Sequence, residues 1–167
     1  VRNEESRFLL SGGFLYEWSH GSGDVFQGRG DGVWNFFLTT GKGFGKNHFV
    51  GTIGWELPNN GSAESESIFY SLHLDREIAD GIYVLTEFTG IEYVESGKAF
   101  PGVNMEGGDL INLGAGDVAG NHFASWAIGG AWKPNRHLSI GAAYEIPVTN
   151  RKDFMDNRVT ANLSLFY

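Results

Sequence analysis

The sequence of 167 residues has no cysteine, only four prolines and no long hydrophobic run. Without cysteine, a disulfide scaffold and a metal site built on thiolates are excluded. No stretch approaches the roughly 20 apolar residues that a helical membrane span needs. No signal-peptide pattern opens the chain, so we interpret it as a mature form or as a protein that is not exported. The net charge of −8 argues against a protein that binds nucleic acid.

Glycines and aromatic residues are frequent instead. The chain holds 25 Gly, 13 Phe, six Tyr and five Trp, yet its mean hydropathy is slightly negative. Such a composition without long apolar runs is typical of a membrane β-barrel, because half of each strand faces a polar interior. The length fits a single domain, which we expect to span residues 1–167.

The last nine residues alternate strictly and end on an aromatic residue. One side of the expected strand carries Val159, Ala161, Leu163, Leu165 and Tyr167, and the other carries Thr160, Asn162, Ser164 and Phe166. This pattern resembles the closing strand of bacterial outer-membrane β-barrels, where alternating apolar residues before a terminal aromatic form the insertion signal. The chain departs from that family at Asn162, where glycine is frequent. The resemblance implies a place in the outer membrane of a Gram-negative bacterium, among outer-membrane lipids.

Alternation of apolar and polar residues predicts eight strands in all. They cover residues 7–18, 33–44, 48–56, 67–76, 82–93, 122–133, 137–146 and 159–167. Both faces of 82–93 are substantially apolar, and there Glu87 indicates that Tyr83, Leu85 and Glu87 look inward. All four prolines, Pro58, Pro101, Pro134 and Pro147, are expected outside the strands, as a closed ladder requires.

The predicted connections alternate between short and long. Turns fall near residues 46, 80 and 134, and loops cover 19–32, 57–66, 94–121 and 147–157. This alternation is the plan of an antiparallel up-and-down transmembrane β-barrel with short periplasmic turns and long extracellular loops. We therefore predict an all-β, eight-stranded barrel. The alternative is a soluble β-sandwich or lipocalin-like barrel, in which the apolar face would point inward.

Aromatic residues mark both ends of the predicted strands. The outer ends carry Tyr16, Trp18, Trp34 and Trp55, and the inner ends carry Phe8, Phe44, Trp132 and Tyr167. Leu, Ile, Ala and Gly lie between the two bands. The arrangement resembles the aromatic girdles that membrane barrels place at the two membrane interfaces.

Polar side chains define the predicted inward face. The set comprises Glu17, Asn35, Glu56, His73, Asp75, Glu87, Glu145 and Asn162. Side chains can fill an eight-stranded barrel, so a wide pore of the porin type is not expected. Buried carboxylates must be paired, hydrated or protonated, and Arg7, Arg76 and Arg158 are the candidate partners. The set is either a structural network or a narrow path for cations or protons.

No catalytic site is predicted. His73 and Asp75 could supply the histidine and the carboxylate of a hydrolytic triad, but no nucleophile lies at a spacing that would complete it. His137-Leu138-Ser139 resembles the His-x-Ser pair of outer-membrane lipid A deacylases, as does the chain end 163–167. However, His137 falls at the short-turn end, whereas lipid A lies in the outer leaflet, and position 151 is Arg where that family has Glu.

The predicted loops are strongly acidic. Ten acidic residues stand against four basic ones, namely Asp24, Asp31, Glu64, Glu66, Glu95, Glu106, Asp109, Asp117, Asp153 and Asp156 against Arg29, Lys98, Arg151 and Lys152. Oxygen-rich loops suit Ca²⁺ or Mg²⁺, but no loop has the Asp-x-Asp-x-Asp spacing. No metal site or other cofactor is therefore predicted, beyond weak loop-bound Ca²⁺ or Mg²⁺.

The loop at 94–121 is longer than an ordinary connection. Its apolar Leu110, Ile111, Leu113 and Val118 need a surface to pack on. It is expected to cap the barrel, enter the lumen, extend a hairpin above the membrane or dock a protein partner.

The predicted function is non-enzymatic. We expect a membrane anchor or scaffold, or a protein that meets partners through its acidic loops. The alternatives are a narrow transport barrel with an acidic lumen and a lipid-modifying hydrolase.

Overall fold

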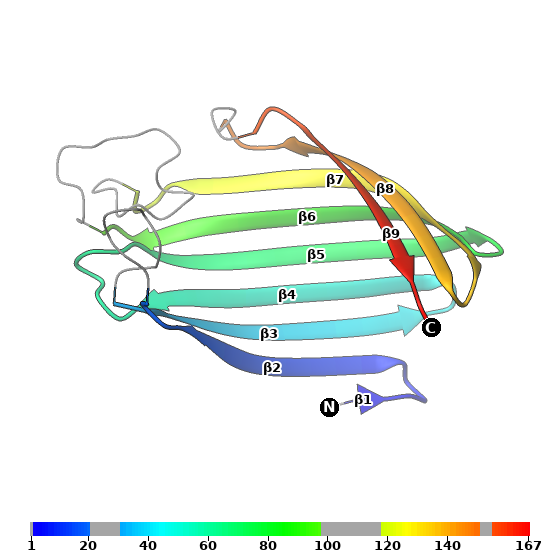
Figure 1. Cartoon of the computed structure of the whole chain (residues 1–167), viewed down its shortest axis with the longest axis horizontal. Helices are drawn as coiled ribbons and strands as arrows, with labels where there is room; N and C mark the ends of the chain where they lie inside the picture. Colours follow the sequence, from blue (N-terminus) through cyan, green and yellow to red (C-terminus); the bar gives the residue numbers. More distant parts are fainter. Residues whose placement is uncertain (1, 21–30, 98–117, 151–154) are drawn as a thin grey trace.

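The computed structural model describes residues 2–20, 31–97, 118–150 and 155–167. These ranges are all-β, and they contain no helix that could span a membrane. Nine antiparallel strands form one sheet in chain order (Figure 1). They are β1 Arg2–Asn3, β2 Phe8–Glu17, β3 Val33–Phe44, β4 Asn47–Pro58, β5 Glu66–Ala79, β6 Ile82–Glu95, β7 His122–Asn135, β8 Leu138–Pro147 and β9 Arg158–Leu165.

The all-β, up-and-down arrangement predicted from the sequence is confirmed. Strands β2 to β9 correspond to the eight predicted strands, with bounds that differ by a few residues. The two-residue β1, which pairs with Phe8 and Leu9 of β2, was not predicted. The sheet therefore has nine strands.

The sheet is open. Its edges are β1 and β9, and in the described part of the chain no backbone pairing joins β9 to β1 or β2. The sheet is nevertheless strongly curled, because β8 (orange) and β9 (red) bend over the front of the other strands in Figure 1.

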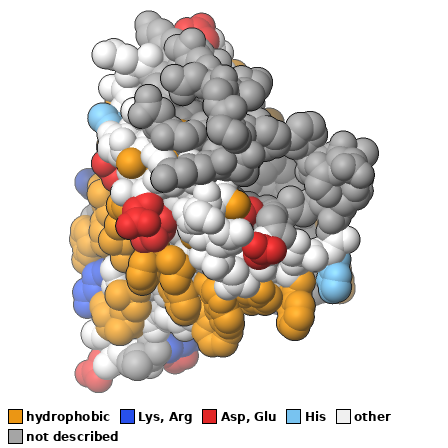
Figure 2. Space-filling view, turned by 90° about the vertical axis from the view of Figure 1, so that its left-hand side faces the viewer, with side chains coloured by type: hydrophobic (Ala, Val, Ile, Leu, Met, Phe, Trp, Pro, Cys, Tyr) orange, Lys and Arg blue, Asp and Glu red, His pale blue; other side chains and the backbone are white. Residues whose placement is uncertain are grey.

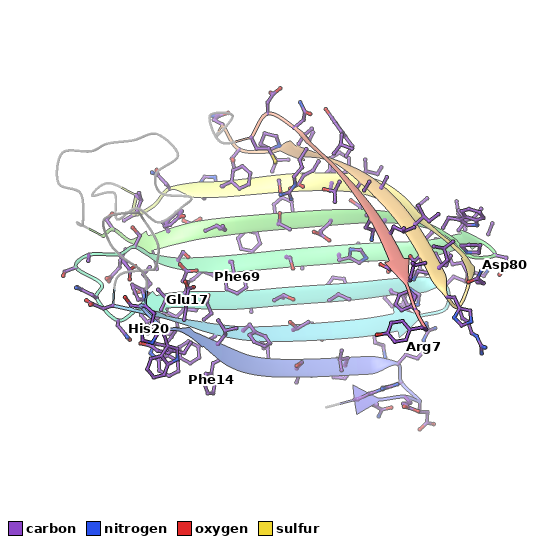
Figure 3. The ribbon with its side chains drawn as sticks, viewed as in Figure 1. Arg7, Phe14, Glu17, His20, Phe69 and Asp80 are labelled. Atoms are coloured by element: carbon purple, nitrogen blue, oxygen red, sulfur yellow. The ribbon has the colours of Figure 1, made fainter. Side chains whose placement is uncertain are left out.

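Short and long connections alternate as predicted. Gly45–Lys46, Asp80–Gly81 and Arg136–His137 join strands at one end of the sheet, which we call the short-turn end. The β1–β2 turn lies at this end too, and the remaining connections lie at the opposite, long-loop end. Figure 3 shows Arg7 and Asp80 at the short-turn end, and Glu17 and His20 at the long-loop end.

The predicted exclusion of proline from strands is wrong. Pro58 and Pro147 are the last residues of β4 and β8, and Pro134 lies within β7. Each is at a position that tolerates a missing N–H, because Pro134 falls in the register irregularity between Trp132 and Asn135 and the other two end their strands. Pro101 lies outside the described residues.

Strand register sorts the side chains onto two faces. Phe36 pairs with Trp55 and Leu38 with Ile53 on one face, which we call the outer face. Thr39 pairs with Thr52, and His73 with Glu87, on the inner face. Glu87 thus shares the inner face with His73, as the sequence indicated for the strand 82–93.

Few hydrophobic side chains are buried. Those in the described residues are Val33, Tyr93, Val118, Phe123 and Ala124, all at the long-loop end. Exposed apolar side chains cover the outer face instead, and they include Phe14, Phe36, Leu38, Ile53, Trp55, Leu72, Leu74, Val84, Trp126, Ile128, Tyr144, Val159 and Leu163. On the inner face Leu9, Leu15, Phe37 and Val50 are exposed as well. The more apolar face is thus an exposed one, which is the reverse of a soluble β-sandwich.

Two aromatic rings on the inner face lie over glycines of the neighbouring strand. A Cβ atom at Gly54 would collide with the ring of Phe69, and one at Gly13 would meet the ring of Phe37. Phe69 is the register partner of Gly54, and Phe37 is that of Gly13. The missing side chains thus make room for large rings on an otherwise polar face.

Candidate functional site

A row of charged and imidazole side chains crosses the inner face from the β1–β2 turn to β6. Arg7 Nη2 donates to His48 Nε2 over 2.8 Å, and His48 Nδ1 lies 2.7 Å from Asp75 Oδ1. The other carboxylate oxygen of Asp75 lies 3.3 Å from His73 Nε2. His73 Nδ1 in turn lies 3.1 Å from Glu87 Oε2. We call these five residues the inner row.

Strand pairing brings the members of the inner row together. His48 on β4 is the register partner of Asp75 on β5, and His73 on β5 is the partner of Glu87 on β6. Asp75 follows His73 by two residues, so both side chains leave β5 on the same side. Two cross-strand pairs and one step along β5 therefore produce a continuous line of contacts.

Arg7 anchors the row at the short-turn end. Its backbone has φ of 51°, a left-handed conformation that is uncommon for a residue with a side chain. Its Nη1 donates to the Gly45 carbonyl over 2.7 Å, while Nη2 reaches His48. The Arg7 carbonyl also accepts a hydrogen bond from the Gly43 amide. Arg7 therefore fastens the β1–β2 turn to the β3–β4 hairpin.

Hydrogen-bond chemistry restricts the protons in the row. Arginine only donates, so His48 Nε2 must accept and His48 Nδ1 carries the proton that it donates to Asp75. His73 lies between two carboxylates, which accept hydrogen bonds when ionised. Both of its contacts are hydrogen bonds only if the ring carries two protons or one carboxyl group is protonated. If every contact in the inner row is a hydrogen bond, the row therefore carries one proton more than it would with neutral imidazole rings and ionised carboxylates.

The row is sheltered but not sealed from water. The side chains of Asp75 and His73 are 21% and 28% exposed, and those of His48 and Glu87 are 37% and 42% exposed. Its contacts suit the holding and passing of protons. Within the described residues, no group of three or more His, Cys, Asp or Glu side chains is arranged to bind a metal ion.

A second polar cluster occupies the inner face of β6 to β9. Ser125 Oγ donates to Glu145 Oε1 over 2.5 Å, and Thr89 Oγ1 lies 2.8 Å from Ser125 Oγ. Arg158 Nε donates to Glu145 Oε2 over 2.7 Å. Glu145 is only 8% exposed, and among the described residues one arginine and one hydroxyl group compensate its charge.

The eight inner-face residues predicted from the sequence form several separate groups. His73, Asp75 and Glu87 meet in the inner row, whereas Glu145 belongs to the second cluster. Asn35 and Glu56 are register partners on β3 and β4. Asn162 lies beside Gly141, and Glu17 ends β2.

The arginine partners proposed from the sequence divide in the same way. Arg158 pairs with Glu145, and Arg7 joins the inner row through His48. Arg76 alternates with Asp75 along β5 and therefore belongs to the outer face.

Sequence reasoning missed His48 and the hydroxyl pairs. His48 has the same parity as Val50 and Thr52, so continuing the alternation to the first residue of the predicted strand would have placed it on the inner face. Thr39 and Thr52 hydrogen-bond each other over 3.0 Å, as do Thr89 and Ser125 over 2.8 Å. No sequence spacing marks such pairs, because the two members come from different strands.

The predicted outer aromatic band forms a continuous array of rings. Trp34 contacts Tyr16, Phe14 and Phe36 at centroid distances of 4.6, 5.6 and 6.0 Å. Trp18 and Trp55 extend the array at its two ends. Seen from the long-loop end, hydrophobic side chains gather along one outer margin with acidic side chains beside them (Figure 2). Figure 3 shows Phe14 pointing away from the sheet.

The four residues of the predicted inner aromatic band lie at the short-turn end. Phe44 and Trp132 are each about half exposed on their strands, and Phe8 begins β2. Tyr167 follows β9 and is fully exposed.

His137 does not contact Ser139, its neighbour in the His-x-Ser motif. It lies in the β7–β8 turn rather than in the strand, which begins at Leu138. Its Nδ1 donates to the Phe166 carbonyl over 2.8 Å, and its Nε2 accepts from Arg136. Nδ1 thus holds the turn against the chain segment after β9, while Nε2 contacts Arg136 within the turn.

Only the flanks of the 94–121 loop are described. Val118 packs against Tyr93 and Ile91, and the backbone amides of Val118 and Ala119 donate to Ser96 Oγ. Leu110, Ile111 and Leu113 lie outside the described residues. So do Asp24, Arg29, Lys98, Glu106, Asp109, Asp117, Arg151, Lys152 and Asp153 of the acidic loops.

No family model matches the chain, and neither a curated protein nor a solved structure shows significant similarity to it. The residues and their geometry therefore provide the basis for a functional proposal.

Proposed function

We propose that the chain is an outer-membrane β-barrel that acts as a non-enzymatic anchor or scaffold, with its outer face against lipid. The observation that carries the proposal is the reversed distribution of side chains. Leu38, Ile53 and Ile128 are each at least half exposed on the outer face, while Ser125 and Glu145 are buried on the inner face. Lipid favours such an exposed apolar surface, whereas water penalises it.

The membrane setting requires the sheet to close. Each backbone N–H or C=O group left unpaired in hydrocarbon costs several kcal/mol. The free edges of the sheet are β9 and the part of β2 beyond its short pairing with β1. Strands β2 to β9 are eight, an even number, so β2 and β9 run antiparallel and can pair with each other. We infer that they do so in the membrane.

The aromatic residues also support an outer face that lies against lipid. The array around Trp34 lies at the long-loop end, and Phe44 and Trp132 lie at the other end of the outer face. Within the array, Trp34 Nε1 donates to Asn59 Oδ1 and Trp55 Nε1 donates to Glu66 Oε1. Rings with an apolar body and a hydrogen-bonded polar edge suit a membrane interface.

Tryptophan fluorescence tests the proposal directly, because Trp34, Trp55, Trp126 and Trp132 all lie on the outer face. In the full chain refolded into vesicles, lipids with brominated acyl chains should quench the tryptophan fluorescence strongly, and aqueous acrylamide should quench it weakly. Its unheated form should also migrate faster in gels than its boiled form, since a closed ladder resists detergent. Quenching by acrylamide alone, without a gel shift, would exclude the membrane location.

A second candidate function is narrow proton transport, in which the inner row would form a relay across the short-turn end of the interior. The row offers alternating carboxylate and imidazole groups within hydrogen-bond reach from Arg7 to Glu87. Vesicles containing a pH-sensitive dye should then acidify faster with the protein than without it. The His73→Gln variant should remove this flux. Thr39→Ala, which breaks an inner-face pair outside the row, should preserve it.

A further inference from the structure

A groove of about 460 Å³ crosses β5, β6 and β7 toward the short-turn end. Leu74, Val84 and Ile128 line it with exposed apolar side chains, and Arg76 and Asn47 line it as well. Arg76 is the register partner of both Asn47 and Val84, so it stands between β4 and β6 beside the apolar part of the groove. The groove belongs to the outer face, which the proposed function places against lipid.

The groove exists because small residues interrupt the apolar surface. Val84 pairs with Gly130, which has no side chain, and Leu74 pairs with the short Thr86. Larger neighbours stand on both sides, since Thr86 pairs with Ile128 and Ile140 pairs with Trp132. The depression therefore lies between two cross-strand rows of larger side chains and can accept methylene groups of an acyl chain.

The one hydroxyl group on the groove floor is already satisfied. Thr86 Oγ1 accepts a hydrogen bond of 2.6 Å from Trp126 Nε1 and donates one of 3.0 Å to the Ala127 carbonyl. Because its donor and one of its acceptor sites are used, the floor can be covered by hydrocarbon at little cost. The groove is thus apolar except near Asn47, Asp75 and Arg76, and the Asp75 carboxylate bonds to His48 and His73 on the inner face.

Arg76 is available to a ligand. Its side chain is exposed, and no hydrogen bond, ion pair or ring contact to another described residue engages its guanidinium group. The acidic neighbours on β5 do not compensate it, since Asp75 bonds to His48 and His73 on the inner face and Glu77 accepts the Gly81 amide. Lys46, in the turn just before Asn47, adds a second positive charge.

We infer that this groove binds one anionic phospholipid, with its phosphate at Arg76 and an acyl chain over Leu74, Val84 and Ile128. A guanidinium group binds phosphate oxygens by paired, charge-assisted hydrogen bonds, which accounts for the headgroup. Charge at this end of the sheet favours an anionic lipid. Seven basic residues stand against five acidic ones there, namely Arg2, Arg7, Lys42, Lys46, Arg76, Lys133 and Arg136 against Glu4, Glu5, Asp75, Glu77 and Asp80.

Native mass spectrometry of the refolded full chain tests the inference. The protein in a neutral detergent is incubated with phosphatidylglycerol or with phosphatidylcholine, and retained lipid is counted per protein. The wild type should retain phosphatidylglycerol preferentially. Arg76→Gln should lower that retention by about tenfold, the equivalent of one charge-assisted contact. Arg136→Gln, in the β7–β8 turn at the same end, should leave it unchanged.

A second variant tests the apolar part of the groove. Val84→Trp should reduce the retention of both lipids while leaving Arg76 in place, because the indole ring fills the groove. Equal retention of the two lipids by the wild type would overturn the inference, as would an Arg76→Gln variant that retains phosphatidylglycerol like the wild type. A wild type that has the mass of a dimer without bound lipid would also overturn the inference, because a second copy would then cover the groove.

This inference rests on the proposed membrane function, and the gel shift separates the two. A wild type with no shift between unheated and boiled samples would refute the membrane function, and the lipid site with it. A normal gel shift combined with unselective lipid retention would refute only the lipid site. Each variant is compared after its own gel shift has shown that it folds.

Discussion

His73 and Glu87 face each other across β5 and β6, with the His73 Nδ1 atom 3.1 Å from Glu87 Oε2. The same ring contacts Asp75 through its other nitrogen. One imidazole therefore joins a cross-strand contact to a contact along its own strand. Its position between two carboxylates joins Glu87 to the rest of the inner row.

The His73–Glu87 contact should appear as a coupling energy. We expect a double-mutant cycle of His73→Ala and Glu87→Ala to give about 0.5–1 kcal/mol, because both side chains are partly exposed. Urea unfolding of the protein refolded in detergent micelles provides the measurement. The value should fall in high salt, and a coupling that is zero at low salt would show that the contact does not stabilise the fold.

Loss of the Arg158 side chain should destabilise the protein more than the exposure of this side chain suggests. Its partner Glu145 is 8% exposed, so Arg158→Ala leaves a buried carboxylate whose remaining partner among the described residues is the Ser125 hydroxyl. We expect a loss of about 2–3 kcal/mol in the free energy of unfolding. Arg136→Ala, in an exposed turn, serves as the control and should lie within about 0.5 kcal/mol of the wild type. Equal losses in both variants would contradict the assigned role of the Glu145 cluster.

Two substitutions at Arg7 separate backbone strain from side-chain contacts. Both Arg7→Ala and Arg7→Gly remove the contacts with His48 and the Gly45 carbonyl. Only alanine keeps a Cβ atom at a φ of 51°. We therefore expect the glycine variant to be more stable than the alanine variant by about 1 kcal/mol. Chemical denaturation of the two variants compares them, and an alanine variant as stable as the glycine variant would argue against the left-handed backbone at this turn.

Much of the fold follows from the period of two in the sequence. The alternation from Trp34 to Thr40 and from Val159 to Tyr167 predicted where strands lie and which residues share a face, since successive side chains in a strand point to opposite sides. The short turns near residues 46 and 80 predicted antiparallel neighbours. These features are local, so a single sequence contains them.

The partners within the site are not local. His48 meets Asp75 only because of the register between β4 and β5, and register depends on turn geometry and on bulges such as that between Glu77 and Ala79. The strand β1 is two residues long, too short to show an alternating pattern. Pro134 lies in β7 at a register irregularity that the sequence pattern did not predict.

Closure of the sheet should be detectable by cross-linking, because the chain has no cysteine of its own. Cysteines introduced at Ser11 of β2 and at Thr160, Asn162 or Ser164 of β9 all lie on the inner face. If β2 and β9 pair in the membrane, one of these three combinations should form a disulfide in vesicles. Ser11→Cys with Ser71→Cys on β5 is the control and should not. No cross-link at any position would mean that the edges stay apart.

A charge on the outer face should destabilise the protein far more than a change on the inner face of the same strand. Leu163 is 65% exposed on β9, and its neighbour Asn162 points to the inner face beside Gly141. If lipid covers the outer face, Leu163→Arg places a guanidinium group in hydrocarbon. We expect it to lower the free energy of unfolding in bilayers by about 2–4 kcal/mol, whereas Asn162→Ser should cost much less.

The same pair of variants in detergent micelles separates lipid contact from sheet stability. The guanidinium group that Leu163→Arg introduces can reach water around a micelle, so the loss for this variant should shrink there, while the small effect of Asn162→Ser should stay the same. Urea titration of both variants in vesicles and in micelles gives the four values. Equal losses for the two substitutions in vesicles would mean that the outer face of β9 does not meet lipid, and the membrane proposal would then fail at the strand whose pattern first suggested it.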